Sequence, residues 1–276
     1  MPATPKVWFV TGSSRGFGRV WTRAALERGD SVVATARSAE AVTDLVADYP
    51  DRALALPLDI TDRGAVIEAV RAGHEHFGRL DVIVNNAGFG LFAAVEETTE
   101  AQARAQLETN LLGPLWVVQA ALPYLRAQGS GHILQVSSLS GVATFPLLGL
   151  YQASKWALEG LSETLAGEVA GFGIKVTLLE PGAFRTEWAG VSADHAEEMP
   201  AYDDVRASID GHENWYHHGR PEATTELLFE IVDSAEPPLR VLLGRSATPL
   251  VRAVYESRLA TWTTWESRGY TAGGAD

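Results

Sequence analysis

Residues 6–18 read Lys6-Val7-Trp8-Phe9-Val10-Thr11-Gly12-Ser13-Ser14-Arg15-Gly16-Phe17-Gly18, an apolar run followed by a glycine-rich turn. The apolar run predicts a buried strand. The periodic stretch after the turn continues through Leu26 and stops at Gly29, and glycine just past the last periodic residue commonly ends a helix. Strand, glycine turn and helix in this order are the context that a dinucleotide-phosphate site needs.

Each glycine of this turn has a separate role in such a site. Gly12 permits a tight turn, Gly16 lets the backbone approach a pyrophosphate, and Gly18 lets the helix pack close to the sheet. Backbone N–H groups at the helix start then face the phosphates. The spacing GxxxGxG differs from the GxGxxG of larger dehydrogenases, and it also fits an ordinary turn. The flanking strand and helix favour phosphate binding, with contacts expected also from Ser14, Arg15 and Phe17.

The second expected strand, residues 31–37, bears on the choice of nicotinamide cofactor. An NAD site has a carboxylate near the end of this strand, whereas an arginine suits the 2′-phosphate of NADP. This strand ends in Ala36 and Arg37, and no acidic residue lies between Ser31 and Ala39. Arg15 adds a second guanidinium, a group that matches phosphate geometry. The sequence therefore favours NADP(H), although both arginines could also be solvated surface residues.

Tyr151 and Lys155 lie four positions apart in LYQASKWAL, and Ser138 precedes them by thirteen positions in VSSLSG. On a helix, residues four apart lie on one face. A phenol has a pKa of about 10, and a nearby ammonium favours the phenolate and lowers that pKa. We therefore expect a tyrosine with a lowered pKa. Alone, the pair occurs by chance in many helices, but here it follows a glycine turn, NNAG and paired serines.

These motifs together resemble the short-chain dehydrogenase/reductase superfamily, in its single-domain branch. The resemblance covers nearly the whole chain to about residue 190 and, more loosely, the remainder. Within the superfamily, the sequence is most similar to bacterial members grouped with hydroxysteroid and retinol dehydrogenases. Beyond the glycine turn and Arg37, the resemblance implies cofactor contacts from Asp59, Asn86, Ala87, Gly88, Tyr151, Lys155, Pro181, Gly182 and Thr186.

The same resemblance implies a catalytic tetrad of Asn110, Ser138, Tyr151 and Lys155. Ser138 would orient a substrate carbonyl, and Tyr151 would exchange a proton with its oxygen. Lys155 would hold the ribose hydroxyls and lower the tyrosine's pKa, and Asn110 would interrupt its helix and hold a water. Each residue also has a simpler explanation, such as a strand end at Ser138, a helix interruption at Asn110 or helix capping by Asp59.

The rest of the chain predicts one α/β domain. Its 276 residues and 46% hydrophobic content suffice for one large core. Continuous apolar runs alternate with helical stretches, which predicts a Rossmann-type, doubly wound parallel sheet over 1–276. The expected strands are 7–10, 31–36, 53–58, 80–85, 132–137, 175–180 and 240–243. A C-terminal amphipathic helix is expected at about 247–268, and covering its own domain is the default expectation.

Bulk properties exclude several other classes. The net charge of −13 argues against nucleic-acid binding. The absence of cysteine excludes disulfides and thiolate catalysis and leaves the compartment open. With no long apolar span and no signal-peptide core, we expect a cytoplasmic enzyme with no membrane partner. His212, Glu213, His217 and His218 could ligate zinc in principle, but their Gly- and Pro-rich context favours a loop. No metal site is expected.

Substrate recognition is expected after the motifs. Candidate positions are Phe89, Leu91, Phe92, Val142, Phe145, Leu147 and Leu148. A long irregular region, about 187–220, resembles the family's mobile lid and holds Trp188, Met199, Tyr202, Trp215 and Tyr216. Those aromatic residues could line a pocket or belong to the core. A homo-oligomer, dimer or tetramer, is implied by resemblance.

The leading hypothesis is an NADP-dependent oxidoreductase that interconverts a carbonyl and a secondary alcohol, on a bulky apolar substrate. A non-catalytic dinucleotide sensor is one alternative, although a sensor would be expected to lose the tyrosine or the lysine. An epimerase or dehydratase with the same Tyr-Lys chemistry is another, although those relatives usually carry a larger C-terminal region.

Overall fold

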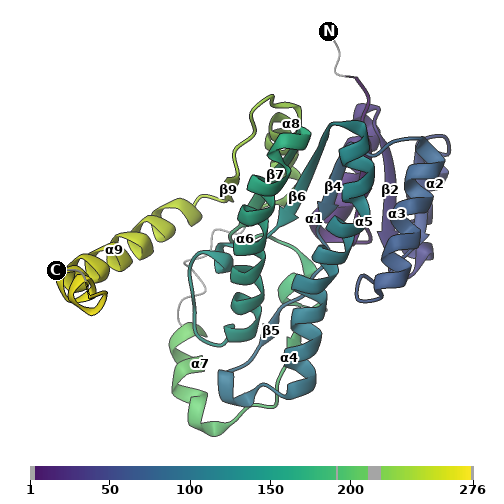
Figure 1. Ribbon diagram of the computed structural model, residues 1–276. Coiled ribbons are helices and arrows are strands. Elements are labelled where there is room, and N and C mark those ends of the chain that lie inside the picture. Colours follow the sequence, from purple (N-terminus) through teal and green to yellow (C-terminus); the bar gives the residue numbers. More distant parts are fainter. Residues whose placement is uncertain (1–3, 191, 211–218, 275–276) are drawn as a thin grey trace.

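Seven parallel strands form the central sheet of the computed structural model, in the order β3-β2-β1-β4-β6-β7-β9 (Figure 1). The structure describes residues 4–190, 192–210 and 219–274. The strands are β1 Val7–Val10, β2 Ser31–Ala36, β3 Ala53–Pro57, β4 Val82–Asn85, β6 Gly131–Val136, β7 Ile174–Pro181 and β9 Arg240–Leu243. The helices are α1 Gly16–Arg28, α2 Thr43–Asp48, α3 Arg63–Phe77, α4 Glu100–Leu107, α5 Gly113–Gln128, α6 Gly149–Val169, α7 Asp203–Asp210, α8 Thr225–Asp233 and α9 Ala247–Ala272.

This topology confirms the expected doubly wound sheet. All seven predicted strands are present, and their bounds differ from the prediction by two residues at most. The strand order reverses between β1 and β4, which lie side by side although two strands separate them in the sequence. Ligands of open parallel sheets bind at the carboxyl ends of the strands flanking such a reversal. The fold therefore directs attention to the segments that follow β1 and β4.

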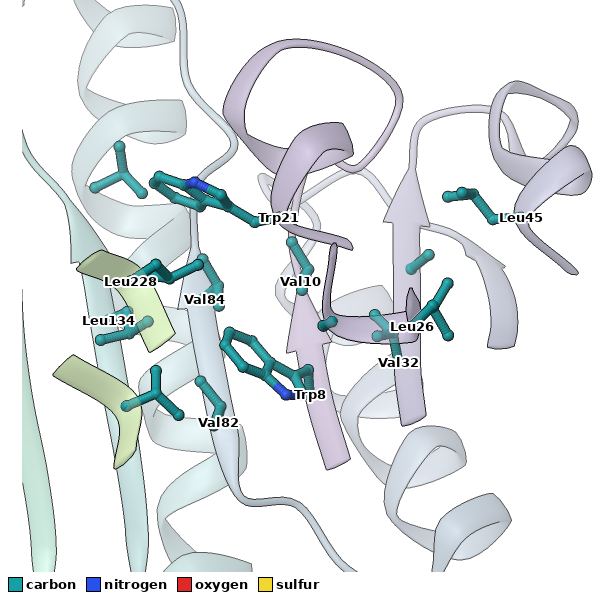
Figure 2. Packing of buried hydrophobic residues seen from close by; sticks show 14 of the residues in the cluster. Trp8, Val10, Trp21, Leu26, Val32, Leu45, Val82, Val84, Leu134 and Leu228 are labelled. Carbon is teal, nitrogen blue, oxygen red and sulfur yellow. The ribbon is translucent and has the colours of Figure 1, made fainter. Parts of the chain in front are cut away.

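Side chains of the strands alternate between two apolar cores. Trp8 and Val10 face a layer formed with α1, α2 and α8 (Figure 2). Val7 and Phe9 face the opposite layer, with α3, α5 and α6. Trp8 and Phe9 are fully buried, and burying a large apolar side chain contributes about 1.5–3 kcal/mol. Burial on both faces explains why the strands are apolar throughout.

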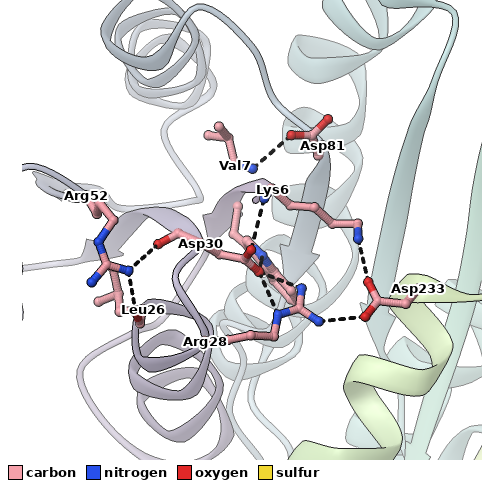
Figure 3. A network of polar contacts seen from close by, with 9 residues as sticks. Lys6, Val7, Leu26, Arg28, Asp30, Arg52, Asp81 and Asp233 are labelled. Carbon is pink, nitrogen blue, oxygen red and sulfur yellow. Dashed lines mark hydrogen bonds and ion pairs between the residues drawn. The ribbon is translucent and has the colours of Figure 1, made fainter. Parts of the chain in front are cut away.

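A polar network fixes the sheet at the amino end of β1 (Figure 3). The buried Asp30 carboxylate accepts hydrogen bonds from the Trp8 indole, at 2.7 Å, and from the Lys6 backbone N–H, at 2.9 Å. Arg28 pairs with Asp30 at 2.5 Å and with Asp233 of α8 at 2.8 Å. The network ties α1 and α8 to the sheet. It lies at the end of β1 opposite the glycine turn, so we regard it as structural.

The region 187–220 contains more regular structure than the irregular segment expected there. Strand β8 (Asp194–His195) pairs with β5 (Leu91–Phe92), and α7 follows. Both strands have only two residues, too few for any periodicity to show in the sequence. Arg206 of α7 pairs with the Glu97 carboxylate, which also accepts from the Met199 backbone N–H at 2.7 Å. Trp215 and Tyr216 lie outside the described residues.

Helix α9 begins where predicted and continues to Ala272. Its first turns cover the domain, because Leu250 and Val251 pack against Leu139 and Val142. Farther along, the helix extends away from the rest of the molecule (Figure 1). Trp262 and Trp265 are 64% and 57% exposed. The default expectation, that this helix covers its own domain, therefore holds only for its first half.

Candidate active site

The turn after β1 packs tightly against the segment after β4. The Asn86 amide donates to the Thr11 and Gly12 carbonyl oxygens at 2.8 and 3.1 Å. The Thr11 hydroxyl accepts from the Asn86 and Ala87 backbone N–H groups at 2.9 and 3.0 Å. Gly12 has φ +71°, and a Cβ at Gly18 would lie 2.3 Å from the Gly12 oxygen. Only glycine fits Gly18, as the role predicted for it requires.

The start of α1 lacks the side chains that usually satisfy a helix N-terminus. Arg15 occupies the N-cap position without a side-chain hydrogen bond, and the first turn has no acidic residue. Among the described residues, then, no side chain caps this end. Free N–H groups and the helix dipole together form an anion site. A Cβ at Gly16 would lie 3.6 Å from Thr186, so the turn also faces the segment after β7. The residues present fit a dinucleotide pyrophosphate.

Two arginines flank this anion site with their charges unpaired. Arg15 and Arg37 are exposed, and neither guanidinium has a hydrogen bond or ion pair within the described ranges. Arg23, on the outer face of α1, instead pairs with Asp44 at 3.2 Å and with Asp48 at 3.4 Å. A phosphate placed at the end of β2 would therefore meet a guanidinium that has no competing carboxylate.

Asp59 and Phe17, which were also predicted to contact the cofactor, make contacts within the protein. Asp59 accepts from the Thr61 backbone N–H and hydroxyl at 2.9 and 2.8 Å, and it does not cap α3. Asp62 is the capping residue, accepting from Ala65 at 3.0 Å. The Phe17 ring packs on Trp21 and Phe184.

The segment after β7 returns to the glycine turn. The Gly182 backbone N–H donates to the Leu243 carbonyl at 2.9 Å, which ties the PGAFRT segment to β9. The Thr186 hydroxyl accepts from the Trp188 backbone N–H at 3.3 Å. Pro181 is the last residue of β7. These contacts place Thr186 at the glycine turn and Trp188 just beyond it.

Helix α6 brings Tyr151 and Lys155 to the carboxyl end of β6. Both side chains are buried, at 5% and 6% exposure. The Lys155 ammonium donates to the Val136 carbonyl at 2.7 Å and lies 5.9 Å from the centre of the Tyr151 ring. Burial lowers the pKa of Lys155 to about 8, and the Glu159 carboxyl opposes that shift. The lysine thus lies near the tyrosine ring. Burial also weakens the binding of the lysine's own proton.

The Tyr151 phenol does not have the lowered pKa expected from the sequence. Burial raises the pKa of Tyr151 to about 12, and the neighbouring Ser138 hydroxyl only partly opposes the shift. Burial penalises the phenolate, and here it outweighs the stabilisation of charge by neighbours. Tyr151 is therefore a phenol at neutral pH, with Ser138 beside it.

Asn110 lies where a helix is interrupted, between α4 and α5. Residues Glu108–Leu112 form one π-helical turn, a feature frequent at functional sites. The fully buried Asn110 amide donates to the Phe89 carbonyl at 2.9 Å and to the Ser154 hydroxyl at 3.2 Å. A Cβ at Gly88 would lie 3.1 Å from Asn110 Oδ1 and 3.8 Å from Lys155 Nζ. The structure therefore brings all four predicted tetrad residues into one region.

Aromatic side chains cover the tyrosine. The Trp188 ring lies 4.8 Å from that of Tyr151 and 5.4 Å from that of Phe92, centre to centre. His195 stacks on Phe92 at 5.2 Å. Among the candidate substrate positions, Val142 and Phe145 belong to a small apolar cluster with Leu250 of α9.

The loop that leads into α6 is strained at a single residue. Leu147 has φ +63°, unlike any other non-glycine residue in the described part of the chain. Its carbonyl accepts from the Ala93 backbone N–H at 2.8 Å. Such strain persists only where the surrounding structure imposes it, and it is common near functional sites. Here it sets the start of the helix that carries Tyr151.

Three charged residues near Lys155 were not identified from the sequence. They are the buried carboxyl groups of Glu159 and Glu180 and the half-buried Arg240, which pairs with both. The spacing of Glu159, one turn after Lys155, was the available signal. Glu180 and Arg240 gave none, because their proximity depends on the pairing of β7 with β9.

Other kinds of site have less support. The histidines His212, His217 and His218 and Glu213 lie outside the described residues, and within the described ranges no cluster of potential ligands could hold a metal ion. In the same ranges, no helix combines the length and the apolar character that crossing a membrane requires. A cavity of about 240 Å³ lies beside Phe184 and Leu243, and neither Ser138 nor Tyr151 lines it.

Comparison with known proteins agrees with this geometry. Residues 6–197 match the family described as short chain dehydrogenase. The chain is 44% identical over 268 residues to oxidoreductase BOA17 of Botryotinia fuckeliana, covering 94% of this chain and 96% of that protein. It is 34% identical over 261 residues to the 3-ketodihydrosphingosine reductase of Bacteroides thetaiotaomicron, covering 91% of each.

Solved structures give the same result. A short-chain dehydrogenase from Streptomyces avermitilis superposes with a TM-score of 0.92 at 41% identity, covering 99% of this chain and 100% of that one. An alcohol dehydrogenase from Thermococcus sibiricus, complexed with 5-hydroxy-NADP, gives 0.72 at 26% identity, covering 87% and 96%. The chain therefore belongs to the short-chain dehydrogenase/reductase superfamily and is an oxidoreductase acting on CH–OH groups.

Proposed function

We propose that this protein is an NADP(H)-dependent reductase of a bulky apolar ketone, with Asn110, Ser138, Tyr151 and Lys155 as its catalytic residues. The observation that carries the proposal is the buried Tyr151 phenol, with Ser138 beside it and the Lys155 ammonium 5.9 Å from its ring. A buried phenol with a pKa of about 12 holds its proton at neutral pH. It is therefore available as a proton donor.

In the proposed reaction, the bound cofactor supplies or accepts the hydride. The Ser138 hydroxyl donates a hydrogen bond to the substrate oxygen and orients it. Tyr151 donates its proton to that oxygen, because the alkoxide formed there is far more basic than a phenolate. The Lys155 ammonium stabilises the phenolate left behind and would also hold the ribose hydroxyls. Asn110 supports the lysine through the π-helical turn beside it.

The cofactor preference rests on the arginines. Arg37 at the end of β2, with Arg15 in the glycine turn, supplies guanidinium groups without carboxylate partners in the part of the chain described. Guanidinium groups bind phosphate in a bidentate manner. The pyrophosphate would lie on Gly12, Ser14, Gly16 and the N-terminus of α1, with Asn86, Ala87 and Gly88 opposite and Thr186 near the nicotinamide.

The aromatic cover of the site supports a bulky apolar substrate. The Trp188 ring lies tilted against Tyr151 and against Phe92, and His195 stacks on Phe92. Large aromatic surfaces of this kind favour an apolar ligand. The similar protein from Bacteroides thetaiotaomicron is named for the reduction of 3-ketodihydrosphingosine. We propose that segment 187–220 acts as the substrate lid.

Self-association is part of the proposal. Exposed aromatic residues on the distal half of α9, Trp262 and Trp265 among them, support it. Large apolar side chains clustered on a surface are typical of contact sites.

The test is Tyr151→Phe, followed by NADPH oxidation over a panel of steroid, aromatic and long-chain ketones. Turnover should fall about 100- to 10,000-fold, the usual contribution of general acid catalysis, with the NADPH dissociation constant unchanged. Tyr255→Phe, an exposed tyrosine on α9, is the matched control and should behave as wild type. Full activity of Tyr151→Phe would overturn the assignment. NADPH binding by wild type without turnover of any carbonyl would favour a sensor.

A further inference from the structure

The buried carboxyl groups of Glu159 and Glu180 share the guanidinium of Arg240, and Glu159 lies one helical turn from Lys155. Arg240 Nε lies 2.9 Å from Glu159 Oε2 and 3.7 Å from Glu180 Oε1. Arg240 Nη2 also pairs with Glu163 at 2.7 Å. Glu159 and Glu180 are only 5% and 2% exposed, whereas the Glu163 side chain is 62% exposed. One arginine thus faces three carboxylates, two of them away from solvent.

The pair is placed by three elements that meet at the catalytic end of the sheet. Glu159 lies one helical turn after Lys155 on α6, so the two side chains share a face. Glu180 lies near the end of β7, and Arg240 begins the neighbouring strand β9. The charged groups around the pair are Lys155, which acts on Glu159, and Arg240, which acts on both carboxyl groups and also pairs with Glu163.

Several oxygen atoms of this cluster have no hydrogen-bond partner among the described residues. They are Glu159 Oε1, Glu180 Oε1, Ser137 Oγ and Ser162 Oγ. Ser137 Oγ and Glu159 Oε1 lie 2.6 and 3.3 Å from the position that a Cβ would take at Gly141, so both approach one point. A buried, unpaired carboxylate oxygen is costly. A proton on one carboxyl group removes one charge and adds a donor.

We propose that Glu159 and Glu180 form a carboxyl pair that holds one proton and keeps the Lys155 ammonium charged, which makes Glu159 a positioning residue for the catalytic lysine. The effect of the pair on catalysis rests on the role proposed above for Lys155. The sharing of one proton by Glu159 and Glu180 does not depend on that role.

The direction of each titration agrees with this arrangement. Burial, and then Glu159, raise the pKa of Glu180 to about 7. Burial raises the pKa of Glu159 as well, against Ser137, Arg240 and Lys155. As the pH rises through about 7, the pair gains a negative charge, and this charge favours the Lys155 ammonium. The gain comes just below pH 8, where the Lys155 ammonium begins to lose its proton.

The chain has only three lysines, Lys6, Lys155 and Lys175, so each can be followed separately. We would label lysine with ¹³C at Cε and record its chemical shift from pH 5 to pH 11 in the full-length protein. Lys155 should show two inflections, one near pH 7 from the pair and one at higher pH from its own proton. In Glu159→Gln, the lysine's own inflection should move down by about one pH unit or more. In Glu180→Gln, the inflection near pH 7 should vanish.

Glu163→Gln is the matched control, because Glu163 lies on the same helix and pairs with the same arginine but is exposed. It should leave both inflections in place. The inference is overturned if the wild-type curve has a single inflection, or if Glu159→Gln leaves the lysine curve unchanged while the protein stays folded. Neither result depends on turnover, so failure of the pair and failure of the Tyr151 assignment are distinguishable.

A second readout separates positioning from mere structural support. The NADPH dissociation constant of Glu159→Gln should rise at lower pH than that of wild type and should match wild type at pH 6. A purely structural role would weaken binding equally at both pH values.

Discussion

Replacing Arg37 by alanine should weaken NADPH binding and leave NADH binding unchanged. Arg37 follows β2 directly and is exposed, with no partner for its guanidinium in the described part of the chain. A hydrogen bond to a charged group contributes about 1.5–3 kcal/mol. At 1.4 kcal/mol per tenfold, the NADPH dissociation constant should rise about 10- to 100-fold. Salt screens exposed charges, so the effect should shrink toward the lower figure as ionic strength rises.

The measurement is isothermal titration calorimetry of both cofactors with wild type and two variants. Arg23→Ala is the matched control, because Arg23 is a partly exposed arginine of α1, the helix after the glycine turn, but pairs with Asp44 and Asp48. It should leave both dissociation constants within about twofold, since exposed ion pairs contribute little.

Two results would refute the reasoning about the 2′-phosphate. In one, Arg37→Ala weakens NADPH and NADH equally, which would mean that Arg37 acts on the turn as a whole. In the other, Arg23→Ala has the same effect as Arg37→Ala, which would mean that only general positive charge matters. A loss confined to NADPH but recovered by Arg37→Lys would point to charge without the bidentate geometry of a guanidinium.

Two further changes concern stability. Gly18→Ala should destabilise the fold by at least about 1–3 kcal/mol in urea unfolding and abolish NADPH binding, because its Cβ would lie 2.3 Å from the Gly12 oxygen. Gly160→Ala is the control; it lies in open space on α6 and should stabilise the fold by about 0.5–1 kcal/mol. Equal effects of the two substitutions on the free energy of unfolding would contradict the argument. Burial lowers the pKa of His132 to about 4, so the stability that its neutral form gives is complete above pH 6.5 and is lost as the pH falls toward 4. About 2 kcal/mol should be gone by pH 5 in wild type but not in His132→Gln, and parallel pH profiles of the two proteins would exclude this cause.

Much of the fold could be predicted from the sequence because parallel strands buried on both faces are continuous apolar runs. The run from Val7 to Val10 and the glycines at 12, 16 and 18 likewise predicted β1 and the turn into α1, but the reversal in strand order beside β1 came only from the structure. The two-residue strands β5 and β8 could not be predicted, since their pairing depends on tertiary contact alone. The periodicity of apolar residues predicted helix α9, but it could not predict which surface the apolar face of that helix contacts.

In the candidate site, some residues could be predicted from local motifs and others only from the three-dimensional structure. Local motifs placed Tyr151, Lys155 and Ser138 on elements that the sheet then brings together. Glu180 and Arg240 have no local signal, since they become neighbours of Lys155 only when β7 pairs with β9. Trp188 could be recognised as one of several aromatic residues after β7, but only the three-dimensional path of the chain places it on Tyr151.

The pKa of Tyr151 shows most clearly why chemistry at a site needs the structure. The sequence supplies two opposing effects, an ammonium that lowers the pKa and an apolar surrounding that raises it. Their balance depends on distance and burial, and here burial prevails, because it is the larger effect on the pKa of Tyr151 and Ser138 opposes it only in part. The same burial acts on Lys155 and lowers its pKa to about 8. The lysine proposed to stabilise the Tyr151 phenolate therefore requires a nearby negative charge to keep its own proton. The proposed carboxyl pair, in which Glu159 lies one helical turn from Lys155, supplies the charge that such support requires. The titration of Lys155, rather than activity alone, is therefore the informative measurement.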